Sequence, residues 1–124
     1  MSNERDIMRC VRITCLPVNA PSERPITIDA ILDEKDEICG TYPLFGVWGK
    51  PDHTKDSYNP LVLRGDGVID YGDAFDPVAD RYFEFDLRAD RIAVNRLLSY
   101  KSRNRAIVVN YLIDDVSTLP PEPK

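Results

Sequence analysis

Aspartates and glycines gather in residues 59–73, NPLVLRGDGVIDYGD, a segment that also contains an Arg-Gly-Asp triplet. Such a segment is compatible with a metal-binding loop, an adhesion motif or a turn. A calcium loop needs oxygen ligands at alternating positions and a closing Glu, and the spacing of Asp66, Asp70, Asp73 and Asp76 does not provide them. We therefore predict a turn and no metal site.

The turn that we predict is a β-hairpin with a three-residue loop at positions 65–67. The second glycine of this loop supplies the positive φ that such a hairpin needs. Leu63 then pairs with Ile69, and Leu61 with Tyr71, which places these apolar side chains together on one face.

Other catalytic and cofactor-binding patterns do not occur in the chain. There is no glycine-rich phosphate loop and no nucleophile elbow. The single histidine, His53, stands in a polar segment, and the three cysteines, Cys10, Cys15 and Cys39, lack the spacing of a zinc site. We expect no metal, no cofactor and no enzymatic activity, and we expect reduced, mostly buried thiols.

Charge is unevenly distributed along the chain, which has a net charge of −5 and a pI near 4.8. This balance argues against direct binding of nucleic acid, which requires that phosphates be neutralised. Acids concentrate at residues 29–37, whereas basic residues concentrate at 88–105. The candidate partner-binding acids form two groups. They are Asp29, Asp33, Glu34, Asp36 and Glu37 in the first group, and Asp66, Asp70, Asp73, Asp76 and Asp80 in the second.

Hydrophobic periodicity predicts the elements that position these acids. An alternating pattern predicts strands at 7–18, 80–87 and 105–115, and a short apolar run predicts another at 42–50. In residues 27–40, an apolar stripe at Ile28, Ile31, Leu32, Ile38 and Cys39 predicts a helix. That helix would carry the first group of acids.

Residues 89–101 support two interpretations. Ala89, Ile92, Ala93, Leu97 and Tyr100 form a helical stripe, whereas Ile92, Val94, Leu98 and Tyr100 would form one face of a strand. We favour the helix. The predicted fold is therefore α+β, an antiparallel sheet of five to six strands with one or two helices on one face. The alternative is an all-β, lipocalin-like barrel. Residues 1–117 would form one domain, followed by a proline-rich tail at 118–124.

Two partial family resemblances accompany this fold. Residues 9–32, RCVRITCLPVNAPSERPITIDAIL, resemble the opening of the CRISPR-associated RAMP superfamily, which implies a ferredoxin-like fold and guide-RNA binding. The segments GVWGK, LVLRGDGVIDYG and YFEFDL are similar to lipocalin-like β-barrels, which implies an apolar ligand pocket.

Three functions follow from these observations. The first is a non-enzymatic inhibitor, of the immunity or anti-CRISPR type, whose acidic surface binds a basic protein surface. The second is a small-molecule-binding barrel with a cavity lined by Phe45, Trp48, Phe83 and Phe85. The third is an RNA-binding module that uses the basic residues of the last third. Because no signal peptide or membrane-spanning apolar segment is evident, we expect a cytoplasmic protein that does not bind a membrane.

Overall fold

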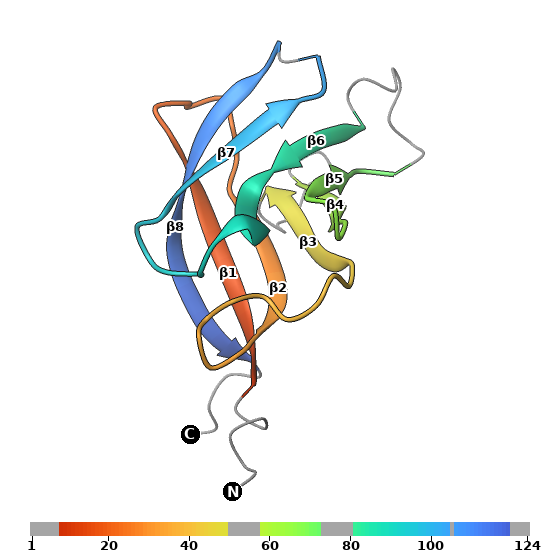
Figure 1. Cartoon of the computed structure of the whole chain (residues 1–124). Helices are drawn as coiled ribbons and strands as arrows, with labels where there is room; N and C mark the ends of the chain where they lie inside the picture. The colour runs from red at the N-terminus through yellow and green to blue at the C-terminus, as the bar shows by residue number, and fades with distance from the viewer. Residues whose placement is uncertain (1–7, 50–57, 73–80, 105, 120–124) are drawn as a thin grey trace, which may run out of the picture.

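The computed structural model describes residues 8–49, 58–72, 81–104 and 106–119. Within these residues the chain forms a closed antiparallel barrel of eight strands, each paired with its neighbours in sequence and the last paired with the first (Figure 1). The strands are β1 (Arg9–Val18), β2 (Ile26–Leu32), β3 (Leu44–Gly49), β4 (Tyr58–Leu63), β5 (Val68–Asp70), β6 (Tyr82–Phe85), β7 (Leu97–Ser102) and β8 (Val108–Leu119). The predicted α+β fold is therefore wrong, because the described residues form no α-helix.

The segment predicted as a helix at 27–40 is strand β2 followed by a turn. In β2, Ile26, Ile28, Ala30 and Leu32 are buried, which is the strict alternation of a strand. The helical stripe was misleading because Ile31, one of its members, lies on the outer surface with 40% of its area exposed. Isoleucine and threonine at alternate positions favour a strand over a helix.

The ambiguous segment at 89–101 is also not a helix. A 3₁₀ turn, η4 (Asp86–Ala89), ends β6, and β7 begins at Leu97. Leu98, Tyr100 and Ser102 are buried from β7 at period two. The strand interpretation, which we considered and did not favour, is correct for Leu97 to Lys101, whereas residues 90–96 form no strand and Val94 is exposed.

The other predicted strands are confirmed as β1, β3, β6 and β8, and the hairpin is confirmed as β4 and β5. In the hairpin, Leu63 pairs with Ile69, Arg64 N–H donates to the carbonyl of Val68 at 2.8 Å, and Gly67 has φ of +87°. The Arg-Gly-Asp triplet forms the turn itself. The last strand reaches Leu119 and so includes two residues that the sequence assigns to the tail.

The two ends of the barrel differ. The lower end in Figure 1 is where β1 begins and β8 ends. Toward this end, Leu87 of η4 and Ile92 of the chain that follows it are buried in the core. The N–H of Ile92 donates to the carbonyl of Asp36 at 2.8 Å and so joins the two loops that cover this end. The upper end, formed where β1, β3, β5 and β7 finish, carries the candidate site. No described helix is long and apolar enough to span a membrane.

Candidate functional site

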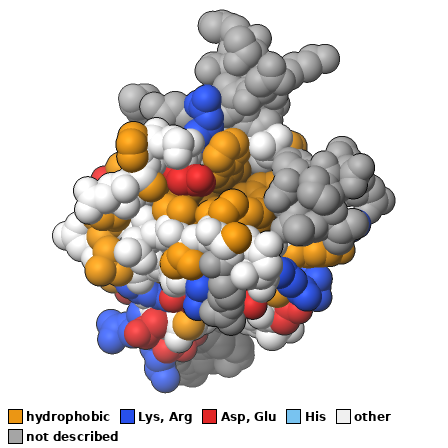
Figure 2. All heavy atoms as spheres, turned by 90° about the horizontal axis from the view of Figure 1, so that it is seen from above, with side chains coloured by type: hydrophobic (Ala, Val, Ile, Leu, Met, Phe, Trp, Pro, Cys, Tyr) orange, Lys and Arg blue, Asp and Glu red, His pale blue; other side chains and the backbone are white. Residues whose placement is uncertain are grey.

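A cavity of about 280 Å³ opens at the upper end of the barrel. We call it the mouth cavity. An eight-stranded barrel has room inside for its own side chains or for one small ligand, and here the cavity occupies only the upper part. Figure 2 looks down on this end and shows hydrophobic side chains gathered in the middle of the face. The cavity is lined by Glu23, Trp48, Asn59, Tyr71, Phe83, Tyr100 and Ile107.

Aromatic rings from consecutive strands form the walls of the mouth cavity. The rings of Phe83 on β6 and Tyr100 on β7 are stacked, with centroids 4.5 Å apart and planes at 4°. Tyr71, just after β5, meets Phe83 edge to face at 5.8 Å. Below them, Phe85 and Tyr111 pack edge to face at 5.9 Å. Because inward positions on neighbouring strands lie side by side, the alternation of each strand builds one continuous aromatic cluster.

Two tyrosines, Tyr71 and Tyr100, line the cavity, and a third, Tyr111, is buried in the core behind it. The hydroxyls of Tyr71 and Tyr100 are hydrogen-bonded at 2.7 Å, and the hydroxyl of Tyr111 donates to the carbonyl of Arg24 at 2.8 Å. Burial raises the pKa of all three tyrosines well above the ordinary value, and mutual repulsion and the charge of Glu23 add to the rise. These hydroxyls are therefore neutral throughout the physiological range of pH.

Trp48 contributes the indole at the end of β3. Its Nε1 atom is buried and makes no hydrogen bond of normal geometry within the described part of the chain. The nearby indole slightly offsets the rise in the pKa of Tyr111, which burial causes. Trp48 is therefore a weakly satisfied donor next to the cavity wall.

Glu23 places a carboxylate at the same cavity, from the loop between β1 and β2. The loop is held by the N–H of Glu23, which donates to the carbonyl of Ala20 at 2.9 Å, and by the Tyr111 bond to Arg24. Glu23 is half-buried, and its carboxylate forms no hydrogen bond or ion pair with another described residue.

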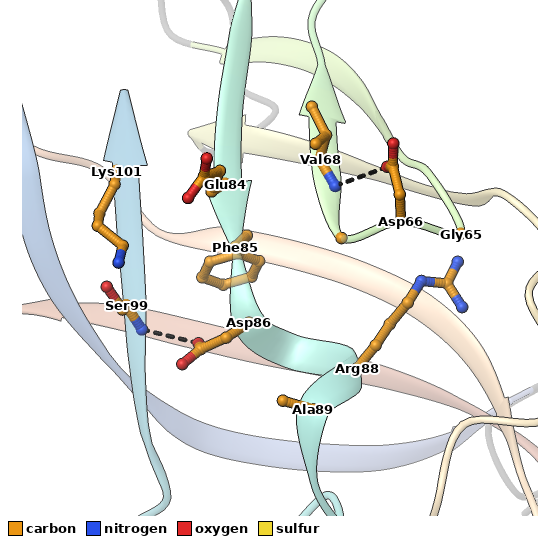
Figure 3. Close-up of a pocket in the computed structure, with 11 residues that line it drawn as sticks. Gly65, Asp66, Val68, Glu84, Phe85, Asp86, Arg88, Ala89, Ser99 and Lys101 are labelled. Atoms are coloured by element: carbon orange, nitrogen blue, oxygen red, sulfur yellow. Dashed lines mark hydrogen bonds between the residues drawn. The ribbon is translucent and has the colours of Figure 1, made fainter. Parts of the chain in front are cut away.

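A second hollow, of about 420 Å³, lies outside the barrel beneath the turn between β4 and β5 (Figure 3). Its polar groups serve the fold: Asp66 accepts from the N–H of Val68 at 3.1 Å, and Asp86 accepts from the N–H of Ser99 at 2.8 Å. Lys101 stands opposite Glu84 in the register of β6 and β7. Figure 3 shows Arg88 extending toward Gly65 and away from Lys101. We therefore regard the mouth cavity as the better candidate site.

The acids of the first predicted group do not share a helix face, because the helix does not exist. Asp29 lies on the outer side of β2, where Arg12 donates two hydrogen bonds to it at 2.8 and 3.0 Å. Asp33 accepts from the backbone N–H groups of Lys35 and Glu37 and so forms a turn. Asp36 forms an ion pair with Arg9. Glu34 and Glu37 are exposed beside this turn.

The second predicted group of acids is only partly described. Asp66 forms an ion pair with Arg64 at 2.7 Å, and Asp70 forms one with Arg81 at 2.8 Å. Hydrogen bonds from Arg81 are the main cause that lowers the pKa of Asp70. Asp73, Asp76 and Asp80 lie outside the described residues, as does His53. Where these acids are described, the protein's own arginines bind them.

Two of the basic residues in the last third also have internal roles. Arg88 donates to the carbonyls of Arg64 and Leu63 at 2.9 and 3.1 Å, and also to the carbonyl of Tyr42. Arg96 donates to four carbonyls around η4. These guanidinium groups hold loops together, which reduces the support for an RNA-binding surface built from them.

The sequence anticipated part of the cavity lining. Trp48 and Phe83 line the mouth cavity as predicted, whereas Phe85 is buried below it and Phe45 lies outside the barrel with 65% of its area exposed. Residues that sequence reasoning missed are Glu23, Asn59, Tyr71, Tyr100 and Ile107. Tyr71 and Tyr100 were identifiable as inward positions of strands, but nothing in the loop sequence NAPSERP marked Glu23.

The described residues define an up-and-down antiparallel β-barrel whose sheet closes on itself. No protein-family model, curated protein or solved structure matches the chain. The two family resemblances therefore stay predictions, and the function has to be argued from the site.

Proposed function

We propose that this protein binds a small molecule in the mouth cavity. The observation that carries the proposal is the cavity itself, which opens from solvent into an aromatic interior. A site for a small ligand is typically concave and mostly apolar, with a few polar groups that fix orientation. The mouth cavity combines four aromatic side chains with one amide, Asn59, and one carboxylate, Glu23.

The volume limits the ligand. Water occupies about 30 Å³ per molecule in the liquid, so 280 Å³ corresponds to about nine waters and to a ligand of roughly ten non-hydrogen atoms. This is at the lower limit of ordinary ligand sites, which excludes a long fatty acid or a haem inside the barrel. A single-ring compound or a short branched amine or alcohol has the appropriate size.

Intrinsic fluorescence tests the proposal directly, because Trp48 is the only tryptophan in the chain and lines the cavity. We expect one or more single-ring compounds, drawn from neutral, cationic and anionic sets, to change its emission in a saturable way. The same compounds should raise the melting temperature, since a ligand that binds only the folded state stabilises it.

Adjacent positions before and in β8 provide a matched pair of variants. Ile107 lines the cavity and is 40% exposed, whereas Val108 is 59% exposed and is not part of the lining. Ile107→Phe should weaken binding by filling the opening, and Val108→Phe should leave binding unchanged. The proposal fails if no compound of any charge gives a saturable response, or if both variants bind equally well.

The inhibitor hypothesis stays a prediction and now has less support. It depended on carboxylates that are available to a basic partner, whereas Asp29, Asp36, Asp66 and Asp70 form ion pairs with arginines of the same chain. Exposed ion pairs are weak, so a partner could displace them, but they neutralise the field that would attract it.

A further inference from the structure

We propose that the ligand of the mouth cavity is a small organic cation, whose charged nitrogen lies between the carboxylate of Glu23 and the aromatic walls. This inference rests on the proposed function, because it names the chemical class that the same cavity selects. It depends on three observations: which charges line the cavity, how Glu23 is held, and what the walls are made of.

The first observation concerns the charge of the described residues that line the cavity. Glu23 is the only charged residue among the described residues that line it. Its neighbour Arg24 is exposed and forms no ion pair with it in the described part of the chain. Removing a carboxylate partly from water without a partner costs free energy, and a positively charged ligand offsets this cost.

The position of Glu23 is defined by the fold. The Tyr111 hydroxyl donates a hydrogen bond to the carbonyl of Arg24, the residue next to Glu23, and so connects the loop to strand β8. The negative charge of Glu23 acts on the hydroxyls of Tyr71, Tyr100 and Tyr111, where it contributes to their raised pKa values. Because Glu23 lines the cavity, the field of its carboxylate there favours a cation over an anion.

The walls suit a cation as well. A cation over the face of an aromatic ring is attracted to it, and tryptophan is the most effective ring. Trp48, Tyr71, Phe83 and Tyr100 all line the space that Glu23 borders. The neutral hydroxyls of the Tyr71–Tyr100 pair also offer oxygen atoms that can accept from an ammonium N–H. The net charge of −5 attracts cations to the molecule at long range.

A set of four single-ring compounds tests the inference, and three of them, benzylamine, benzyl alcohol and benzoate, are of almost equal size. Benzylamine is a cation, benzyl alcohol is neutral and benzoate is an anion, while benzyltrimethylammonium is a cation without an N–H donor. We expect Trp48 fluorescence to show that benzylamine binds at least about tenfold more tightly than benzyl alcohol, with benzoate the weakest. Tight binding of benzyltrimethylammonium would show that the faces of the aromatic rings supply most of the preference for a cation. Weak binding of this compound would show that N–H donation to Glu23 supplies most of that preference.

The variant Glu23→Gln keeps the shape of the side chain and removes its charge. It should bring the affinity for benzylamine down to that for benzyl alcohol, while the affinity for benzyl alcohol is unchanged. Asp114→Asn is the matched control, because it removes one exposed carboxylate far from the lining and should leave the preference intact. A thermal melt of each variant confirms that it is folded.

The outcomes separate the two proposals. If benzyl alcohol and benzylamine bind equally well, or if Glu23→Gln leaves the preference unchanged, the cation inference is wrong and the cavity remains a ligand site. If none of the four compounds binds wild-type protein whereas other neutral or anionic compounds do, the cation inference is again wrong. If nothing binds, both proposals are wrong.

Discussion

At the scale of single residues, Arg96 shows how this small protein fixes a segment that has little regular structure. Its guanidinium donates to four backbone carbonyls, at distances between 2.6 and 3.1 Å. The carbonyls belong to Asp86, Leu87, Asp90 and Arg91. All four lie in or just after η4, the turn that covers the lower end of the barrel. One side chain therefore satisfies carbonyls that no strand or helix would satisfy.

We expect Arg96→Ala to lower the free energy of unfolding by about 2–4 kcal/mol, because hydrogen bonds from a charged donor are worth about 1.5–3 kcal/mol each and the losses are partly offset by water. Arg96→Lys should recover less than half of the lost free energy of unfolding, since an ammonium group cannot donate to all four of these carbonyls. Urea unfolding followed by Trp48 fluorescence measures both.

Arg91 provides the control for this residue. It is exposed, and its side chain makes no hydrogen bond or ion pair with another described residue. Arg91→Ala should change the free energy of unfolding by less than about 0.5 kcal/mol. Equal effects at Arg91 and Arg96 would mean that charge, and not the carbonyl contacts, explains the result.

At the scale of elements, the closure of the barrel depends on a close approach between β2 and β3. Only three residue pairs join these strands: Ile26 with Trp48, Thr27 with Val47, and Ile28 with Gly46. A Cβ atom added to Gly46 would meet the carbonyl oxygen of Thr27 well inside van der Waals contact, and would lie 2.8 Å from Cγ1 of Ile28. Glycine is therefore required here by backbone proximity.

Gly46→Ala should lower the free energy of unfolding by about 1–3 kcal/mol, because the backbone of β2 or β3 has to shift to admit one methyl group. It should also alter the emission of Trp48, two residues further along β3. Val47→Ala is the comparison, since Val47 lies on the outer side and loses only strand propensity and some packing, less than about 1 kcal/mol. A Gly46→Ala protein as stable as wild type would show that the two strands separate without cost.

The success of sequence reasoning also differed from one element to the next. Segments whose alternation is pure, such as the one that became β6, were identified with the correct inward face, and so was the hairpin with its glycine at positive φ. Strand β2 was mistaken because isoleucine stands on both of its faces, so the apolar residues fit two periods. Barrel closure joins Cys10 to Leu119, a pairing that no local pattern encodes.

The mouth cavity was less predictable than the strands for a related reason. Its described lining comes from four strands, β3, β4, β6 and β7, and from three connecting segments, and only the closed register brings Trp48, Tyr71 and Tyr100 to one place. No sequence pattern identifies Glu23 as a site residue, because its place at the cavity depends on a loop that is fixed by the hydrogen bond from Tyr111 to the carbonyl of Arg24. Conversely, four of the acids that stood out in the sequence, Asp29, Asp36, Asp66 and Asp70, are bound by arginines of the same chain.

At the scale of the whole molecule, four buried acidic groups share one interior. They are Cys15, Tyr71, Tyr100 and Tyr111. Burial is the largest cause of a raised pKa in each of them, and it raises the pKa of the Cys15 thiol to about 12. In the unfolded chain the ordinary pKa is about 8.5 for cysteine and about 10 for tyrosine. The folded protein therefore holds protons that the unfolded chain has already lost at alkaline pH.

The sign of the resulting pH dependence is fixed, because a raised folded pKa stabilises the fold fully below the unfolded pKa and progressively less above it. We expect the free energy of unfolding to decrease from about pH 8.5 upward, by about 1.4 kcal/mol per pH unit for each group that titrates. The decrease should be steepest above about pH 10, where the three tyrosines join Cys15. Urea unfolding at several pH values between 7 and 11 measures the slope.

Two variants test the origin of this slope. Tyr100→Phe removes one titrating group, so it should reduce the loss of unfolding free energy per pH unit by the contribution of that group. Tyr42→Phe removes an exposed hydroxyl and should leave the slope unchanged. A free energy of unfolding that is constant from about pH 9 to 11 would show that these side chains exchange with solvent, in which case the interior of the barrel is not the packed aromatic cluster described above.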